Sequence, residues 1–192
     1  LHIFVLGYIL NICRFLIPYS IGYAITGDYA VYMEPLLYKV LCNDILTFAG
    51  LAMMLIALFM KIKLSGGMML IITTIMCALG TVFNGVDVQN PLGNIFLGYL
   101  IGTEDAAGLV LSDFPLFNWM IFPTFGYAFA AVLKRVKDKK LFYLTVSLPA
   151  IIIAIVYFSY GITHEVGMFG EGQNCYYHMI FTDVLASLTL TV

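Results

Sequence analysis

Arg14 is the residue whose type and position most strongly suggest chemistry. It lies within an apolar stretch, residues 3–25, and Asn11 stands three positions earlier. Residues three apart share one face of a helix, so both polar groups would point the same way. An arginine near the centre of a bilayer costs about 2.5–3.5 kcal/mol on insertion scales, and we therefore expect it to face a cavity or a partner. Such a face could bind a phosphate or carboxylate. The plainer interpretation is a structural arginine paired with an acid or a free carbonyl.

Four more polar residues stand at the ends of apolar stretches. Asn43 and Asp44 precede one stretch, Asp113 precedes another, and His178 comes just before the last. An acid at a helix start stabilises the helix, which is the structural interpretation of Asp44 and Asp113. The functional interpretation is a polar wall of a substrate or acyl-donor pocket, to which His178 would contribute a titratable ring. No catalytic residue can be assigned from these positions alone.

The composition indicates lipid as the solvent of this chain. Hydrophobic residues make up 62% and charged residues 10% of 192 residues, and the mean hydropathy is +0.98. Soluble domains carry about 25% charged residues. The apolar runs are long and do not alternate, which favours helices over barrel strands. We predict an all-α, polytopic transmembrane bundle with about six spans, at residues 3–25, 43–60, 66–84, 114–133, 141–162 and from Tyr177 onward.

A shorter apolar piece, residues 91–102, is too short to cross the bilayer. We predict a short interfacial or re-entrant helix there.

Basic residues predict the orientation of these spans. Seven of the nine Lys and Arg residues lie in 61–65 and 134–140, whereas most acids lie in the alternate loops. Because cytoplasmic loops are enriched in Lys and Arg, we expect both basic loops to be cytoplasmic, in a bacterial cytoplasmic membrane. The bases would fix the topology and need no catalytic role. The sequence has no basic stripe for nucleic acid. The four cysteines are far apart without a CxxC pair, and no metal site is expected.

The chain begins and ends inside apolar runs. We therefore expect residues 1–192 to be a single transmembrane domain, an internal fragment of a longer chain that lacks the first and last spans.

Three stretches, in order, are similar to integral-membrane acyltransferases. LGYILNICRFLIPY and NDILTFAGLAMMLIALFMK resemble two consecutive spans of that group, and SDFPLFNWMIFPTFGYAFA resembles its F-P-L-F-P-W segment. The resemblance is to heparan-α-glucosaminide N-acetyltransferase-like proteins and the broader acyltransferase-three group, over roughly residues 1–135. Two residues depart from the family pattern: Thr47 stands in place of Gln, and Asn118 in place of Pro.

The resemblance implies a membrane-bound enzyme that moves an acyl group, usually acetyl, from acyl-CoA to a sugar or glycan acceptor across the membrane. Acetyl-CoA would be a co-substrate, with no bound cofactor, and the partners would be the lipid bilayer, the acyl donor and a carbohydrate. The family's essential histidine lies in earlier spans, so it is expected outside this fragment. The alternative hypothesis is a multi-pass transporter or flippase of a sugar or lipid intermediate, which prolines within spans would also suit.

Overall fold

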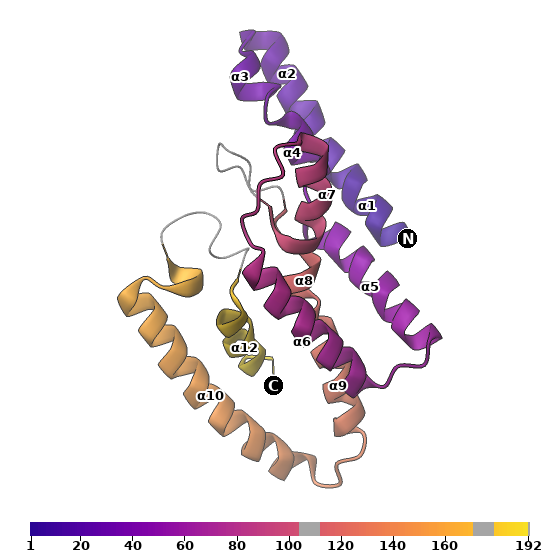
Figure 1. Cartoon of the computed structure of the whole chain (residues 1–192), viewed down its shortest axis with the longest axis vertical. Helices are drawn as coiled ribbons and strands as arrows, with labels where there is room; N and C mark the ends of the chain where they lie inside the picture. The colour runs from indigo at the N-terminus through magenta and orange to yellow at the C-terminus, as the bar shows by residue number, and fades with distance from the viewer. Residues whose placement is uncertain (104–111, 171–178, 192) are drawn as a thin grey trace. The chain divides into compact units, whose positions relative to one another are not determined.

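The described part of the chain is helical. The computed structural model describes residues 1–103, 112–170 and 179–191, and in these ranges the only extended pairing is an isolated bridge between Asn43 and Ser112. The predicted all-α class is therefore confirmed (Figure 1). The chain divides into two compact units. The first unit comprises residues 1–55 and 83–116, and the second comprises 56–82 and 117–192.

Three helical segments are long and apolar enough to cross a membrane: His2–Thr26, Leu116–Leu133 and Lys139–Phe169. Their presence supports a membrane protein, and they correspond to three of the six predicted spans. Helices α5 (Ile45–Lys61) and α6 (Gly66–Val82) have 17 residues each. At 1.5 Å per residue they measure about 25 Å, slightly less than a bilayer core of about 30 Å.

The short apolar piece forms α7 (Pro91–Ile101), a helix of 11 residues. Its length is about 16 Å, so it cannot cross the bilayer by itself, as predicted. Asn90 caps its start by accepting hydrogen bonds from the backbone N–H groups of Leu92 and Gly93, and Gly102 ends it at φ 71°. That left-handed conformation is open to glycine without a steric penalty.

The first predicted span forms one continuous helical segment whose middle turn is π-helical. It consists of α1 (His2–Asn11), a π-helical turn (Ile12–Leu16) and α2 (Ile17–Thr26). Pro18 has no N–H with which to bond the carbonyl of Arg14, four residues earlier. The chain widens to a π-turn before the proline, and Ile17 donates to the carbonyl of Ile12. Arg14 therefore sits in a locally irregular turn, of a kind often found at functional sites.

The loop expected between the first two spans contains two short helices, α3 (Tyr29–Tyr32) and α4 (Leu36–Leu41). Asp28 caps α3 by accepting from the N–H of Val31. Since the apolar run of this segment is short and interrupted by Glu34 and Pro35, the sequence pattern did not reveal the helices. Helix α4 matters for the site, because the residues that follow it enter the polar contacts of the first unit.

Helices α1 and α5 pack with almost no side chain between them. A Cβ atom built on Gly50 would lie 2.7 Å from the backbone N and Cα of Phe4, and one on Gly7 would lie 2.9 Å from the backbone N of Thr47. Both glycines are buried. Small residues at such crossings let helix backbones approach closely, which is a common source of association energy within membranes.

The second unit contains α6, α9 (Ile121–Leu133), α10 (Lys139–His164), a 3₁₀ turn (Gly167–Phe169) and α12 (Phe181–Thr189), together with α8 (Leu116–Trp119) except for its first residue, which belongs to the first unit. The hydroxyls of Thr73 and Thr124 join α6 to α9 at 2.7 Å, and both residues are fully buried. The amide of Asn118 donates to the carbonyl of Met179 at 2.8 Å. A proline at 118, as in the family pattern, could not form that bond.

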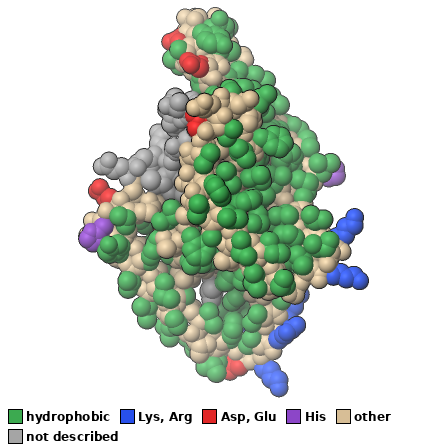
Figure 2. All heavy atoms as spheres, viewed as in Figure 1, with side chains coloured by type: hydrophobic (Ala, Val, Ile, Leu, Met, Phe, Trp, Pro, Cys, Tyr) green, Lys and Arg blue, Asp and Glu red, His purple; other side chains and the backbone are tan. Residues whose placement is uncertain are grey.

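The outer surface is largely apolar. Figure 2 shows hydrophobic side chains over most of the visible face. On α10, Ile152, Ile155 and Val156 are each more than 60% exposed. Exposed branched side chains in this number suit contact with lipid rather than water. The basic residues predicted to fix the orientation lie in the last residue of α5 and the loop after it, in the loop between α9 and α10, and in the first two residues of α10.

Candidate functional site

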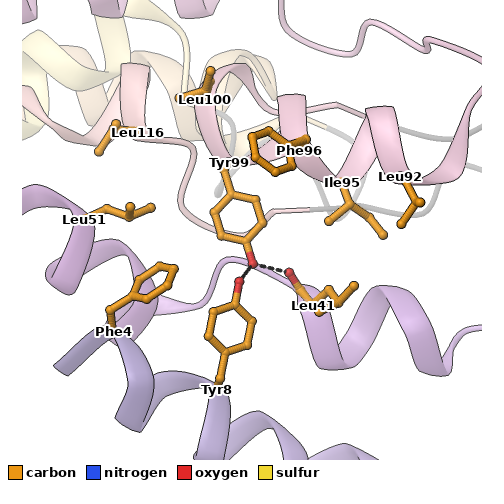
Figure 3. Close-up of a pocket in the computed structure, with 10 residues that line it drawn as sticks. All are labelled: Phe4, Tyr8, Leu41, Leu51, Leu92, Ile95, Phe96, Tyr99, Leu100 and Leu116. Carbon is orange, nitrogen blue, oxygen red and sulfur yellow. Dashed lines mark hydrogen bonds between the residues drawn. The ribbon is translucent and has the colours of Figure 1, made fainter. Parts of the chain in front are cut away.

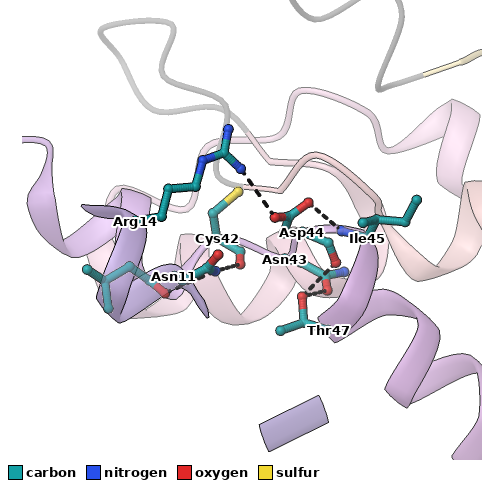
Figure 4. A network of polar contacts seen from close by, with 8 residues as sticks. Asn11, Arg14, Cys42, Asn43, Asp44, Ile45 and Thr47 are labelled. Atoms are coloured by element: carbon teal, nitrogen blue, oxygen red, sulfur yellow. Dashed lines mark hydrogen bonds and ion pairs between the residues drawn. The ribbon is translucent and has the colours of Figure 1, made fainter. Parts of the chain in front are cut away.

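Five of the six predicted site residues belong to one polar cluster in the first unit. Figure 4 shows four of them, Asn11, Arg14, Asn43 and Asp44. His178, the sixth, lies outside the described residues. We define the polar cluster by these members: Asn11, Arg14, Cys42, Asn43, Asp44, Thr47 and Asp113. The cluster combines one cation, two carboxyl groups, two amides, a thiol and a hydroxyl from segments that are up to about one hundred residues apart in sequence. This combination differs from a solvated surface patch because several of its members are buried.

Asn11 is a structural link rather than a ligand group. It is 1% exposed, and its amide nitrogen donates to the carbonyl oxygens of Cys42 at 3.1 Å and Val40 at 3.4 Å. These carbonyls lie at the C-terminal end of α4, where helix carbonyls have no intrahelical partner. Asn11 thus fixes the segment after α4 against the first span.

Asn43 is structural as well. It is fully buried; its amide nitrogen donates to the carbonyl of Phe114 at 2.6 Å, and its amide oxygen accepts from the hydroxyl of Thr47 at 2.8 Å. The N–H of Phe114 donates in turn to the Asn43 carbonyl at 3.1 Å. Residues 43 and 112–114 therefore form a short, paired junction that positions Asp44 and Asp113.

Arg14 and Asp44 remain accessible. The Nη1 atom of Arg14 lies 3.6 Å from Oδ2 of Asp44, and the exposed fractions of the two side chains are 67% and 28%. The distance fits an ion pair but exceeds a normal hydrogen bond. The other oxygen of Asp44 accepts from the N–H of Ile45, the first residue of α5, at 2.6 Å, whereas a capping side chain usually accepts from the second or third residue of the helix. An arginine carries five N–H donors, so this loose pair leaves room for a second anion.

Asp113 is half-buried beside these charges. Burial raises the pKa of its carboxyl above the ordinary value, and the nearby Asp44 carboxylate raises it further, while Lys39, Cys42 and Arg14 oppose the shift. Two neighbouring carboxylates cannot both ionise as easily as one, so the pair favours retention of a proton. Asp113 can thus donate or accept a hydrogen bond closer to neutral pH than an ordinary aspartate.

Cys42 is an inert member of the cluster. Burial raises the pKa of its thiol to about 12, and the Asp113 carboxylate acts in the same direction. Since the thiolate is the nucleophile and the metal ligand, the thiol is not reactive at neutral pH. Among the described residues, no group of three or more His, Cys, Asp or Glu side chains could hold a metal ion.

The raised pKa of Asp113 predicts how Asp113→Asn changes stability with pH. An acid whose pKa is raised on folding stabilises the fold below its unfolded value of 3.8, and that stabilisation is lost as the pH rises through the folded pKa. Asparagine carries no charge at any pH. The variant should therefore gain in melting temperature relative to the wild type as the pH rises above about 4. Thermal unfolding in detergent measures the difference; a gain that shrinks with rising pH would contradict the burial of this carboxyl.

An apolar cavity lies in the same unit (Figure 3). Its volume is about 570 Å³. The lining residues come from α1, α4, α5, α7 and the start of α8, and they are Phe4, Tyr8, Leu41, Leu51, Leu92, Ile95, Phe96, Tyr99, Leu100 and Leu116. Two polar groups in the wall are bonded to each other: the Tyr8 and Tyr99 hydroxyls form a hydrogen bond, and Tyr99 donates to the carbonyl of Leu41 at 2.5 Å.

Sequence patterns did not reveal this cavity, nor the position of Cys42 among the polar groups. One available signal was the spacing of Tyr8, which lies three residues before Asn11 and therefore on the same helix face. Tyr99 gave no signal, because α7 is apolar apart from Asn94 and Tyr99 itself and no polar face of it stands out.

No known family model matches this chain, and comparisons with characterised proteins and with solved structures also find no match.

Proposed function

We propose that this chain belongs to a membrane-bound acyltransferase that moves an acyl group, acetyl being the first candidate, from acyl-CoA to a sugar or glycan acceptor across a bacterial cytoplasmic membrane. The observation that carries the proposal is the position of Arg14. Its side chain is two-thirds exposed on a helix long enough to span the membrane, and its Nη1 atom lies 3.6 Å from Asp44 with Asp113 nearby. A cation beside two carboxyl groups suits a substrate with an anionic group, which the cation would bind, and with hydroxyls, which would donate to the carboxyl groups.

The reaction defines what this site has to supply. The acceptor hydroxyl loses its proton to a base, its oxygen forms a bond to the acyl carbon, and the thioester C–S bond breaks. The CoA thiolate then takes up the proton. Donors must stabilise the oxyanion of the tetrahedral intermediate, and the CoA phosphates need a cationic partner.

In this proposal the polar cluster binds and orients, and it does not perform the proton transfer. Arg14 binds the anionic part of a substrate through its planar fork of donors. Asp44 and Asp113 accept hydrogen bonds from acceptor hydroxyls. The base is the histidine that the resemblance implies outside this sequence.

The direct test uses membranes that contain the intact protein and radiolabelled acetyl-CoA. The expected result is label in a membrane-extractable or glycan product, dependent on the protein. Membranes with the protein that leave all label in acetyl-CoA, across a panel of sugar acceptors and acyl chain lengths, would overturn the enzyme assignment.

One observation favours the alternative, a transporter or flippase. The π-turn and Pro18 interrupt the helix that carries Arg14, and interrupted helices often form the central site of transporters. The two functions differ in the product: a transporter moves its substrate unchanged, so vesicle uptake without any labelled ester or amide would favour it.

A further inference from the structure

The hydrogen bonding in the cavity indicates what kind of ligand it takes. Tyr8 donates its hydroxyl hydrogen to Tyr99, and Tyr99 donates its own to the carbonyl of Leu41. Both hydroxyl hydrogens are thus used within the protein, and the rest of the lining is aliphatic or aromatic carbon (Figure 3). A polar ligand would lose its hydration in such a space without compensation, whereas a hydrocarbon would not.

The cavity opens where a hydrocarbon is available. Phe96 is 81% and Leu92 is 66% exposed, although both line the cavity from α7. The facing wall includes Phe4 and Tyr8, which belong to the helix His2–Thr26 that is long enough to span the membrane. An apolar mouth on such a unit faces lipid chains more readily than water. The volume of about 570 Å³ falls within the roughly 300–1,000 Å³ of ordinary ligand sites.

The cavity and the polar cluster share one segment. Leu41 lines the cavity and accepts from Tyr99, while its neighbours Val40 and Cys42 accept from Asn11 of the cluster. These three consecutive carbonyl groups therefore accept hydrogen bonds both from the wall of the cavity and from the polar cluster. A molecule with its chain in the cavity would therefore lie against the segment that Asn11 holds to the polar cluster, and Arg14 is the cation of that cluster.

We infer that the cavity binds one hydrocarbon chain of a membrane lipid, and that the acceptor of the reaction is lipid-linked, with an anionic headgroup at Arg14. The position of the chain follows from the cavity alone. The role of the lipid as acceptor rests on the proposed function.

Photo-crosslinking tests the chain site without any activity measurement. The protein is placed in nanodiscs with one of two probes, a phosphatidylglycerol with a diazirine in one acyl chain or an isoprenyl phosphate with a diazirine in its tail. After irradiation, mass spectrometry should locate label on lining residues such as Tyr8, Ile95 and Tyr99, and an excess of the same unlabelled lipid should reduce it. The probe that labels at the lower concentration identifies the source of the chain.

A matched pair of variants on α5 separates the cavity from the general lipid surface. Leu51 lines the cavity, whereas Met53, two residues on, is 58% exposed and does not. Leu51→Trp should fill the space and reduce cavity labelling by about tenfold, while Met53→Trp should leave it unchanged. Lining residues that stay unlabelled with both probes, or labelling that excess lipid and Leu51→Trp leave intact, would overturn the inference.

The outcomes keep the two proposals apart. Cavity labelling without acyl transfer would overturn the proposed function and leave the chain site standing. Acyl transfer to water-soluble sugars, with no cavity labelling, would overturn the chain site and leave the proposed function standing.

Discussion

Arg14→Ala is expected to reduce acyl transfer strongly while the amount of protein in the membrane stays nearly constant. The Arg14 side chain is 67% exposed and its contact with Asp44 is loose, so its loss should cost the fold little, on the order of 0–1 kcal/mol for an exposed pair. Loss of its contact with a substrate anion should reduce the rate by about 10–10²-fold, because a hydrogen bond to a charged group is worth about 1.5–3 kcal/mol. Transfer of label from acetyl-CoA, normalised to immunoblotted protein, measures both.

Two further variants define what Arg14 contributes. Arg14→Lys keeps the charge and should restore little activity, because a point charge does not replace a two-pronged donor. Lys61→Ala, at the end of α5, removes a cation outside the polar cluster and should retain activity. If Arg14→Ala transfers acyl groups at the wild-type rate, Arg14 is a structural partner of Asp44 and the site assignment is wrong.

Much of the fold could be predicted because apolar length and helix-end chemistry are local properties. The pattern predicted a span at 3–25, and the structure has a helix at His2–Thr26. It predicted a short helix at 91–102, where α7 covers Pro91–Ile101. Asn90 and Asp138 mark helix starts through their side chains, which is also local information. The sequence did not predict α4, because this helix is too short to give a periodic hydrophobic pattern.

The site was predictable in its members but not in its roles. Polar residues within or beside spans are costly, so Asn11, Arg14 and Asp113 could be chosen on energetic grounds alone. Whether each one faces a ligand depends on contacts between segments distant in sequence. Asn11 turned out to be buried on the carbonyls after α4. Only the structure distinguishes the buried amide of Asn11 from the exposed side chain of Arg14, three residues later.

The cavity was hidden for a related reason. Its walls consist of residues that any apolar helix contains, and an unfilled volume leaves no trace in composition or periodicity. Tyr8 and Tyr99 are 91 residues apart. Their hydrogen bond exists because α1, α4 and α7 converge, and convergence is a property of the fold rather than of any one helix.

Gly50→Ala is expected to destabilise the protein although alanine is the better helix former. A methyl group at this position would lie 2.7 Å from the backbone N, the Cα and the Cβ of Phe4. Backbone atoms cannot move aside as a flexible side chain can, so α1 and α5 would have to separate. Overpacking of this kind costs roughly 1–3 kcal/mol or more, against a gain of about 1 kcal/mol in helix propensity.

Gly126→Ala, on α9, is the matched control because it makes the same change inside a helix with open space around it. Apart from its chain neighbours and the backbone of its own helix, no heavy atom of the described residues lies within 4 Å of a Cβ built there. Gly126→Ala should leave the melting temperature unchanged or raise it, because only the higher helix propensity of alanine acts there. Thermal unfolding of the two variants in the same detergent should thus give shifts of opposite sign.

Gly50→Ala should also weaken acyl transfer, because α1 leads into the turn that carries Arg14 and α5 begins just after Asp44. Forcing the two helices apart lengthens the Arg14–Asp44 contact, and it opens the hydrogen bonds of Asn11 at the end of α4. Equal stability of Gly50→Ala and Gly126→Ala would mean that α1 and α5 do not pack backbone to backbone. The geometry of the polar cluster, which depends on that close approach, would then be wrong as well.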